Sequence, residues 1–234
     1  MTLSQSSKEA VLASHFLLRH LPPDALRRLA AESAVVRHPS HATVFQKGDP
    51  GDSMMAVVRG RVKICAYSGE GKELVLNIIG AGGVFGEIAL LDGQPRTADA
   101  VTLEETDLLV LQRNRFLPFL SASPEITARL FAVLCQRLRQ TSEHLEDTLF
   151  REAPGRLARG LLRLAATFGR PAGKGVRLDI KLSQQQLGNL IGISRESINK
   201  HLGEWTRAGH LTVESGIITL ADPAVLESIA DAEV

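Results

Sequence analysis

The hydrophobic pattern of residues 34–112 has a period of two, which is typical of strands with one buried face. Ten of the twenty glycines lie in residues 48–93, where they predict tight turns between short strands. We therefore expect an N-terminal antiparallel β-roll or barrel in a protein of the α+β class. The expected strands are Ala34–His38, Met54–Val58, Arg61–Ala66, Leu74–Ile79, Thr97–Val101 and Thr106–Gln112.

Helical spacing of apolar residues precedes and follows this β-rich stretch. Residues 8–32 predict two short helices, with Phe16 and the leucines in the core and Asp24 capping the second helix. After the β-rich stretch, the Ser-Pro-Glu run at 123–125 is a good helix start, because serine caps N-termini, proline suits the first position and a carboxylate favours the positive end. A long helix is expected from here to a hinge near Glu152.

The long helix carries a seam of residues at alternating steps of four and three. A repeat of about 3.5 residues places them in one stripe, as in coiled coils. The partner of this stripe is either the β-roll of the same chain or the parallel helix of a second subunit, and the strict repeat favours a homodimer. The seam residues are Thr127, Phe131, Leu134, Leu138, Thr141, Leu145 and Thr148, of which Phe131, Leu134, Leu138 and Leu145 are apolar.

The part of the chain that follows the hinge is basic. Residues 151–210 carry 11 basic and 4 acidic side chains, whereas residues 1–150 carry 16 and 17 and residues 211–234 carry none and five. Such a block fits a surface that binds a polyanion; the alternative is a charged face that is only solvated. Its first elements are a helix expected over residues 154–168 and a flexible basic turn at Gly169–Gly175.

Two short helices joined by a glycine turn are expected next. Ser183 and Gln186 form a capping box for the first, and Ser194 caps the second, which is expected over Arg195–Arg207. This spacing predicts a helix-turn-helix, and two strands within residues 210–220, turning at Glu214-Ser215, predict a hairpin wing. A helical hairpin without a DNA function is the alternative. The residues expected to face DNA are Ser183, Gln184, Ser194, Arg195, Glu196, Ser197 and Lys200.

The stretch Val84–Ala98 interrupts the strand rhythm and gathers residues suited to a nucleotide. Glu87 can accept hydrogen bonds from a sugar hydroxyl, and Arg96 offers a planar fork of donors for a phosphate. Gly86 lets the backbone approach a ligand, and the N–H groups of a helical turn at Ile88–Leu91 would face an anion. A cyclic nucleotide combines a ribose hydroxyl with a singly charged phosphate. The alternative is a glycine turn with a surface glutamate and arginine.

The run F-G-E-I-A-L-x-x-x-x-P-R-T-A at residues 85–98 resembles the phosphate-binding cassette of cyclic-nucleotide-binding domains. With the dimer helix and the winged helix-turn-helix, it makes residues 15–220 similar to the cyclic-AMP receptor protein branch of the Crp/Fnr family of bacterial transcription regulators. We divide the chain into a cyclic-nucleotide-binding β-roll at 1–122, a dimerisation helix and hinge at 123–152, and a DNA-binding domain at 153–234.

The resemblance implies how the ligand is held. Glu87 would bind the ribose 2′-hydroxyl, and Arg96 and Thr97 would bind the cyclic phosphate. Thr141 and Ser142 would meet the base, the serine from the opposite subunit; the alternative for Thr141 is a polar seam residue that sets the register. The expected ligand-binding residues are Gly86, Glu87, Ile88, Ala89, Arg96, Thr97, Thr141 and Ser142.

The resemblance also bears on specificity. The DNA helix of the family has the pattern Ser-Arg-Glu-x-x-x-Arg, which Ser194, Arg195 and Glu196 match, whereas Lys200 stands in the last place and lacks the arginine fork. Thr97 replaces the serine of the cyclic-AMP receptor and occurs in eukaryotic cyclic-GMP-dependent kinases, where its hydroxyl can contact a syn guanine. Cyclic AMP is the expected allosteric ligand, with cyclic GMP as the alternative or additional one.

The remaining residues predict no catalytic or metal chemistry. Cys65 and Cys135 are expected to be buried and unbridged, and two cysteines are too few for an iron–sulfur cluster, which needs about four ligands. The seven histidines are scattered, and no metalloprotease, nucleophile-elbow or P-loop motif occurs. We expect no metal, no haem and no enzymatic activity.

The expected surroundings of the protein follow from composition and resemblance. No apolar run reaches the length of a membrane span, and residues 1–9 lack the apolar centre of a signal peptide, so no membrane partner and a cytoplasmic location are expected. The expected partners are a second copy of the chain, promoter DNA and RNA polymerase. Three alternatives remain: a sensor of another signal on the same scaffold, a nucleotide module that regulates an enzyme or channel, and a DNA-binding protein that acts without ligand.

Overall fold

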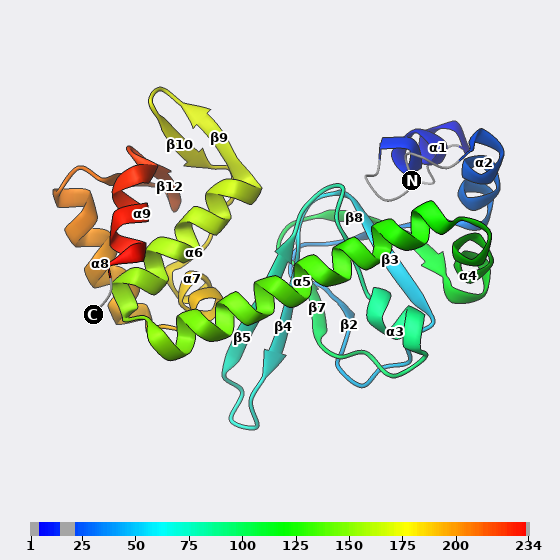
Figure 1. Cartoon of the computed structure of the whole chain (residues 1–234), viewed down its shortest axis with the longest axis horizontal. Coiled ribbons are helices and arrows are strands. Elements are labelled where there is room, and N and C mark those ends of the chain that lie inside the picture. Colours follow the sequence, from blue (N-terminus) through cyan, green and yellow to red (C-terminus); the bar gives the residue numbers. More distant parts are fainter. Residues whose placement is uncertain (1–4, 15–21, 233–234) are drawn as a thin grey trace. The chain divides into compact units, whose positions relative to one another are not determined.

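The structure is a computed structural model that describes residues 5–14 and 22–232 (Figure 1). It separates into two compact units, Met1–Leu138 and Arg139–Val234, and the boundary lies within a long helix. Among the helices of the described residues, none is long and apolar enough to cross a membrane.

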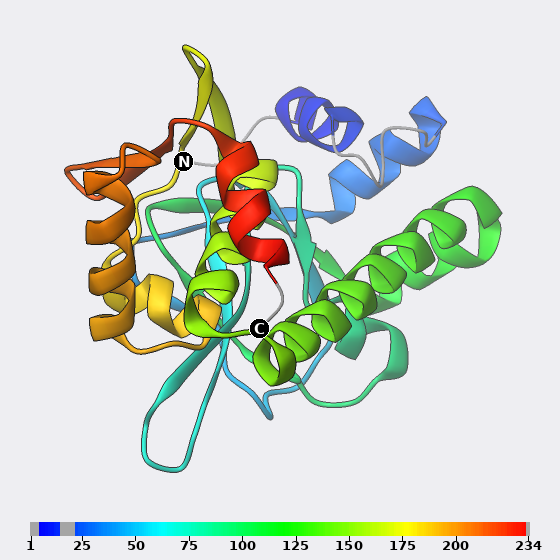
Figure 2. The same ribbon diagram turned by 60° about the vertical axis from the view of Figure 1, so that its left-hand side comes forward.

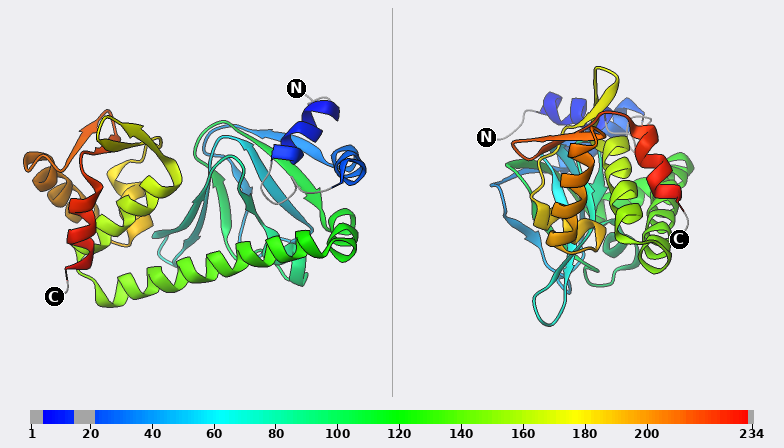
Figure 3. Two further views of the ribbon diagram at one scale, coloured as in Figure 1. Left: turned by 45° about the horizontal axis from the view of Figure 1, so that its top comes forward. Right: turned by 90° about the vertical axis from the view of Figure 1, so that its left-hand side faces the viewer.

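The first unit is built on two four-stranded antiparallel sheets (Figure 3). This arrangement confirms the expected antiparallel β-roll, although the pattern did not reveal the short strands β2 and β6. In spatial order, the first sheet contains β1 (Ala34–His38), β8 (Thr106–Gln112), β3 (Ser53–Arg59) and β6 (Val84–Phe85). The second contains β2 (Thr43–Phe45), β7 (Asp99–Thr102), β4 (Val62–Tyr67) and β5 (Glu73–Ile79).

Strand β3 is buried on both faces, which corrects the expectation of a half-buried strand. Met54 and Ala56 face one apolar cluster with helical residues, and Met55 and Val57 face a second cluster with residues of the other sheet. A strand between two apolar layers has no solvent face to fill with polar residues. The first sheet is therefore the middle layer, with helices on one side and the second sheet on the other.

The helices of the first unit are α1 (Gln5–Ser14), α2 (Pro23–Glu32), α3 (Glu87–Asp92), α4 (Arg113–Ala122) and the N-terminal part of α5 (Pro124–Phe150). The long helix begins where Pro124 predicted it. Pro22, not Asp24, occupies the cap position of α2, and Asp24 lies in its first turn. Helix α4 was not predicted, and it contains Pro118. Phe16 lies outside the described residues.

The cysteines differ from the expectation in one respect. Cys65 is buried and unbridged as predicted, whereas Cys135 on α5 is exposed. Its place on a helix with one buried face explains the difference, because the pattern of apolar residues did not show which side of α5 meets the roll.

The second unit begins with the C-terminal part of α5 and combines helices with one small sheet. Its remaining helices are α6 (Ala153–Phe168), α7 (Gln184–Ile191), α8 (Arg195–Arg207) and α9 (Pro223–Asp231), and α6 packs against α9 (Figure 2). The sheet has the order β11 (Leu211–Glu214), β12 (Ile217–Leu220), β10 (Gly175–Leu178) and β9 (Gly169–Ala172).

Two local predictions about the second unit need correction. The expected flexible turn at Gly169–Gly175 is wrong, because β9 and β10 pair across it as a hairpin and β10 also pairs with β12. The wing turns at Ser215 and Gly216, which both have positive φ, rather than at Glu214-Ser215. Helix α9 was not predicted. The predicted starts of α7 and α8 are confirmed.

Candidate nucleotide site and DNA-binding surface

The cassette begins at a glycine that no other residue can replace without strain. Gly86 has φ of 78° and immediately precedes α3. A Cβ at this position would lie 2.6 Å from Arg96 Nη1, which is closer than atoms that are not bonded approach. The left-handed backbone and the close approach together explain why glycine stands where the chain meets Arg96.

Arg96 is buried, at 5 % exposure, and its fork is held from two sides. Its Nη1 donates to the Gly86 carbonyl at 2.8 Å, and its Nη2 donates to Ser53 Oγ at 3.1 Å. The Nε atom is buried and has no hydrogen-bond partner. Burial lowers the pKa of the Arg96 guanidinium, while nearby carboxylates, Asp52 foremost, act in the opposite direction.

Glu87 is fully buried, at 0 % exposure, in the first turn of α3. Its Oε1 accepts a hydrogen bond from Arg137 of α5, which also donates to the Val84 carbonyl. Its Oε2 is buried and has no partner. Sequence reasoning missed Arg137, because its contact with Glu87 joins segments that are 50 residues apart in the chain.

The two unpartnered atoms define what the cassette can bind. A buried carboxylate oxygen without a partner costs free energy, and an unpartnered guanidinium N–H does so as well. Glu87 Oε2 can accept from a hydroxyl, and Arg96 Nε can donate to an anionic oxygen. A cyclic nucleotide supplies both groups within one small molecule, so the residues present fit it.

The structure brings the cassette residues together in the first unit, and the predicted base contacts belong to the second unit. Ala89 is buried, which leaves its backbone as the group that a ligand would meet. Ile88 and Thr97 are exposed. Thr141 and Ser142 are exposed on the part of α5 that belongs to the second unit.

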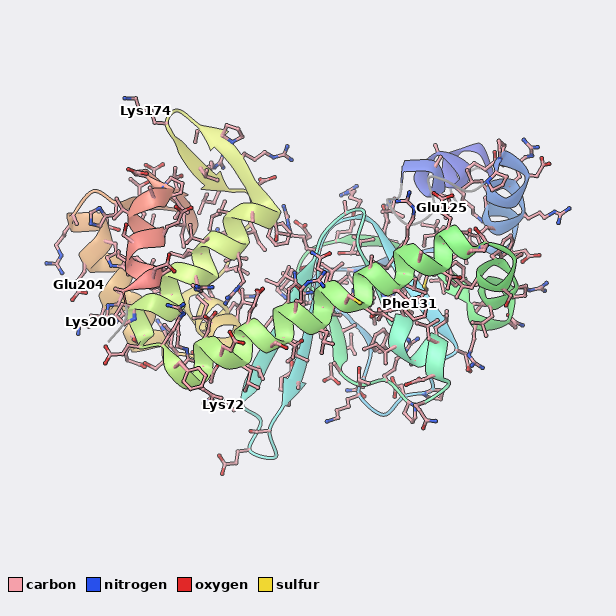
Figure 4. All side chains as sticks on the ribbon, viewed as in Figure 1. Lys72, Glu125, Phe131, Lys174, Lys200 and Glu204 are labelled. Atoms are coloured by element: carbon pink, nitrogen blue, oxygen red, sulfur yellow. The ribbon has the colours of Figure 1, made fainter. Side chains whose placement is uncertain are left out.

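Helix α5 turns different faces inward and outward. Ile126, Leu130 and Val133 are buried within the first unit. Phe131, labelled in Figure 4, is 61 % exposed and Leu138 is 68 % exposed, and the seam continues with exposed Leu145 in the second unit. Two seam residues depart from this pattern: Leu134 is half-buried, and the Thr127 hydroxyl donates to the Leu120 carbonyl at 2.8 Å.

The helix-turn-helix is fixed by its caps. Ser183 Oγ accepts from the Gln186 N–H at 3.1 Å, and Gln186 Oε1 accepts in return from the Ser183 N–H at 2.9 Å. Ser194 Oγ accepts from the Ser197 N–H at 3.1 Å. A capping hydroxyl that accepts in this way keeps its own hydrogen, so Ser183 can still donate to a phosphate, whereas the Ser194 hydroxyl donates to Glu196.

The outer face of α8 carries the predicted DNA-facing residues. Arg195, Glu196 and Lys200 are exposed, and Ser197 is half-buried; Lys200 is labelled in Figure 4. A hydrogen bond from its own backbone N–H, and then one from Ser194, hold the pKa of Glu196 below its usual value. Gln184 is half-buried, and its Nε2 donates to Asn199 Oδ1 of α8 at 3.2 Å.

Arg156 of α6 supports the turn between α7 and α8, and sequence reasoning missed it. Its Nη2 donates to the carbonyls of Ile191 at 3.2 Å and Gly192 at 2.7 Å, which satisfies acceptors at the end of α7. Burial lowers the pKa of Arg156. No sequence pattern marks this contact, because it depends on how α6 packs against the motif.

The fold and the two sites define a nucleotide-binding domain followed by a DNA-binding domain, and comparisons with known proteins agree. Residues 35–123 match the cyclic nucleotide-binding domain family, and residues 155–229 match the Crp-like helix-turn-helix domain. The chain is 34 % identical over 214 residues to the CRP-like cAMP-activated global transcriptional regulator of Mycobacterium tuberculosis, covering 92 % of this chain and 96 % of that protein. This chain belongs to the Crp/Fnr family of transcription regulators.

Two solved structures extend the comparison. A Crp/Fnr-family transcriptional regulator from Thermus thermophilus has a TM-score of 0.70 and 28 % identity, with 86 % of this chain and all of that chain covered (100 %). FixK2 from Bradyrhizobium japonicum has a TM-score of 0.77 over 86 % of this chain and 99 % of its own, and at 18 % identity it supports the fold alone. The protein is therefore a cyclic-nucleotide-binding transcription regulator of this family.

Proposed function

We propose that the protein is a homodimer that binds pseudo-palindromic promoter DNA when a cyclic nucleotide occupies the cassette. Cyclic AMP is the main ligand and cyclic GMP the second. The observation that carries the proposal is the pair of buried, unpartnered atoms, Glu87 Oε2 and Arg96 Nε. They suit the ribose hydroxyl and the cyclic phosphate that both nucleotides share.

The choice of cyclic AMP draws on the relatives. The Mycobacterium tuberculosis protein is described as cAMP-activated, and a relative from Thermus thermophilus, 32 % identical over 193 residues, is described as a cyclic AMP receptor protein. Phosphate and ribose contacts do not distinguish adenine from guanine. Thr97, Thr141 and Ser142 are the residues we expect to meet the base.

A homodimer is supported by the outer face of α5. Phe131 and Leu138 expose large apolar side chains, and Leu145 continues the same repeat. A row of this kind gains stability when a parallel copy of the helix covers it. In the dimer, two copies of α8 would enter successive major grooves, about 34 Å apart, and each would lead with Arg195 and Glu196.

The coupling between ligand and DNA begins at Glu87. This side chain belongs to the cassette, and Arg137 ties it to α5. A nucleotide that bonds to Glu87 therefore acts on a residue already attached to the helix that forms the seam. Nucleotide and DNA would each favour the same state of the dimer, so each must raise the affinity for the other.

One experiment tests ligand, coupling and operator together. The protein is titrated onto a pool of random DNA sites without nucleotide, with cyclic AMP and with cyclic GMP, and calorimetry measures nucleotide binding directly. We expect cyclic AMP to raise DNA affinity at least tenfold at a two-fold symmetric site. Equal DNA affinity with and without nucleotide would contradict the coupling, and no nucleotide binding by the folded protein would contradict the cassette assignment. RNA polymerase is the expected partner at the promoter.

A second candidate is a regulator of this family that answers another signal or acts without ligand. A specific observation keeps it open: the Xanthomonas campestris regulator CLP, 27 % identical with a TM-score of 0.72 over 85 % of this chain and 99 % of its own, is described as c-di-GMP responsive. The ligand panel therefore includes c-di-GMP. Activation by c-di-GMP and not by cyclic AMP would replace the first candidate.

A further inference from the structure

The Arg96 guanidinium has a third neighbour besides Gly86 and Ser53. Its Cζ lies 4.2 Å from the centroid of the Phe45 ring. The two hydrogen bonds hold the Nη1 and Nη2 ends of the fork, and the ring covers one of its faces. Nε is the atom of this side chain that no protein acceptor holds.

The backbone places Phe45 for this contact. Phe45 is the last residue of β2, and the pairing of β2 with β7 shifts register between Thr43 and Phe45. A bulge of this kind bends a strand and redirects its side chains. The Phe45 ring also lies 5.8 Å from the ring of Phe85, which is buried at the start of the cassette. The ring is therefore fixed by its own strand and by a core residue.

An aromatic face is a suitable neighbour for a buried cation. The ring quadrupole presents negative potential at its face, so a cation within about 6 Å of the centroid is attracted, and the attraction grows when water is removed. Burial lowers the pKa of Arg96, which means that the surroundings oppose its charge. The Phe45 face offsets part of that penalty without taking up a hydrogen-bond donor.

We propose that Phe45 is a positioning residue for nucleotide binding: its ring holds the charged Arg96 guanidinium in the orientation that leaves Nε to the phosphate. The proposal rests on the proposed function, in which the phosphate binds Arg96. Phe45 acts through Arg96 and not on the base, so it affects cyclic AMP and cyclic GMP equally.

The rival explanation is that Phe45 only fills space, since it packs against the apolar cluster between the two sheets. Substituting a smaller residue cannot separate the two roles, because it removes both the ring face and the volume. Fluorination separates them. Fluorine draws electron density from the ring and weakens its attraction for a cation, while the shape of the side chain is nearly kept.

The experiment places mono-, di- and trifluorinated phenylalanine at position 45 of the full chain and measures cyclic AMP binding by calorimetry. We expect affinity to fall stepwise with the number of fluorines, by about fivefold in total, with equal losses for cyclic GMP. The thermal midpoint without nucleotide should fall by no more than about 3 °C, because the same attraction offsets part of the burial penalty of Arg96 in the free protein. The same series at Phe116, which is buried in the other apolar cluster of the first unit and lies outside the cassette, should leave affinity unchanged.

The possible outcomes distinguish the role of Phe45 from the proposed function. A flat series at position 45, or an equal loss at position 116, would overturn the role of Phe45 while leaving the proposed function intact. Failure of the unsubstituted protein to bind either nucleotide would overturn both. The geometry has its own test in the nucleotide-free protein: the Arg96 Nε–H proton should show an upfield NMR shift from the Phe45 ring, and Phe45→Leu should abolish it. An Nε–H shift that Phe45→Leu does not alter would also overturn the proposal.

Discussion

Glu87 in the first unit and Asp147 in the second are both buried carboxylates that arginine side chains contact, at 0 and 4 % exposure. Glu87 has one such partner, Arg137, and keeps Oε2 without any. Asp147 lies near the end of α5, and each of its oxygens has a partner. Both sites hold a buried carboxylate, and they differ in how many of its oxygens have a hydrogen-bond partner within the protein.

Asp147 joins three arginines. Arg163 Nη1 donates to Oδ2 at 2.5 Å, Arg151 Nε donates to Oδ1 at 3.1 Å, and Arg159 Nε lies 3.7 Å from Oδ1. Arg151 also donates to the Ala230 carbonyl, so the cluster links α5, α6 and α9. A carboxylate with partners on both oxygens leaves neither oxygen unsatisfied, and Asp147 acts as a structural joint.

A buried carboxylate with an unpartnered oxygen marks a candidate ligand site, whereas one with partners on both oxygens does not. Burial of a charged group costs free energy, and a protein that completes the hydrogen bonds recovers much of that cost. Where the chain leaves one oxygen without a partner, as at Glu87, we propose that the ligand supplies the missing partner. Removal of the two carboxylates should therefore have different consequences. Loss of Glu87 should lower the affinity for the ligand, and loss of Asp147 should lower the stability of the protein.

The largest expected effect is on binding at Glu87. Glu87→Ala removes the acceptor for the ribose hydroxyl, and we expect cyclic AMP affinity to fall by at least about 100-fold, or about 3 kcal/mol. Calorimetry measures the affinity, and Glu70→Ala in the exposed β4–β5 turn is the matched control with no expected loss. A Glu87→Ala protein that binds within threefold of the parent would remove the basis of the comparison.

The second effect is on stability at Asp147. Asp147→Asn leaves three arginines near an uncharged group, and we expect the free energy of unfolding to fall by about 2 kcal/mol, less than for a fully buried pair because the arginines are partly exposed. Trp205, the single tryptophan of the chain, is buried in the second unit and reports urea unfolding there.

The control for Asp147→Asn is Asp179→Asn. Asp179 pairs with Arg170 at 3.4 Å on the surface, where both side chains are well exposed. Such a pair contributes at most about 0.5 kcal/mol. Equal losses of unfolding free energy in the two variants would show that burial does not increase the contribution of Asp147 to stability. Cyclic AMP affinity should stay within threefold of the parent in both.

The contrast between the two carboxylates also shows what sequence can predict. The alternation at 34–112 predicted the β-roll, and Ser183 and Ser194 predicted the starts of α7 and α8, because strands and caps depend on neighbouring residues. The cassette was identified from a run of specified residues. Arg137 and Phe45 were missed, because their roles depend on contacts between distant segments.

The missed elements have local reasons. Helix α4 contains Pro118, which a reading of residue types takes as a helix end. Strand β2 has three residues, too few to show alternation. The cluster at Asp147 left no pattern either, since the spacing of Arg159 and Arg163 by four is common on any basic helix.

A third test ranks the contributions of the arginines around Asp147 to the free energy of unfolding. Arg163→Gln should lower the free energy of unfolding by about 1 kcal/mol, because it removes the shortest of the three contacts. Arg159→Gln should lower it by less, since Arg159 lies farther from Asp147 and shares its charge with Asp231 at 3.3 Å. Urea unfolding monitored by Trp205 gives the order, and a larger loss for Arg159→Gln would contradict this ranking of the contacts.

The smallest expected effect is a pH dependence beside the same cluster. Burial, and then the positive charge of Arg163, lower the pKa of His144, while Asp147 acts in the opposite direction. Because the pKa is lower in the folded state, the unfolded state binds more protons below about pH 6.5. The contribution of neutral His144 to stability is therefore present above that pH and is lost as pH falls through the folded pKa.

His144→Gln should remove this loss. We expect the drop in the thermal midpoint between pH 7.5 and 5.5, followed by Trp205 fluorescence, to be about 1 °C smaller in the variant than in the parent. Burial also lowers the pKa of His38, which lies in the first unit, so His38→Gln serves as the control that should leave the Trp205 signal unchanged. In the Asp147→Asn background the His144 contribution should grow, because the carboxylate no longer supports the protonated ring. A contribution that stays the same there would show that His144 and Asp147 are independent.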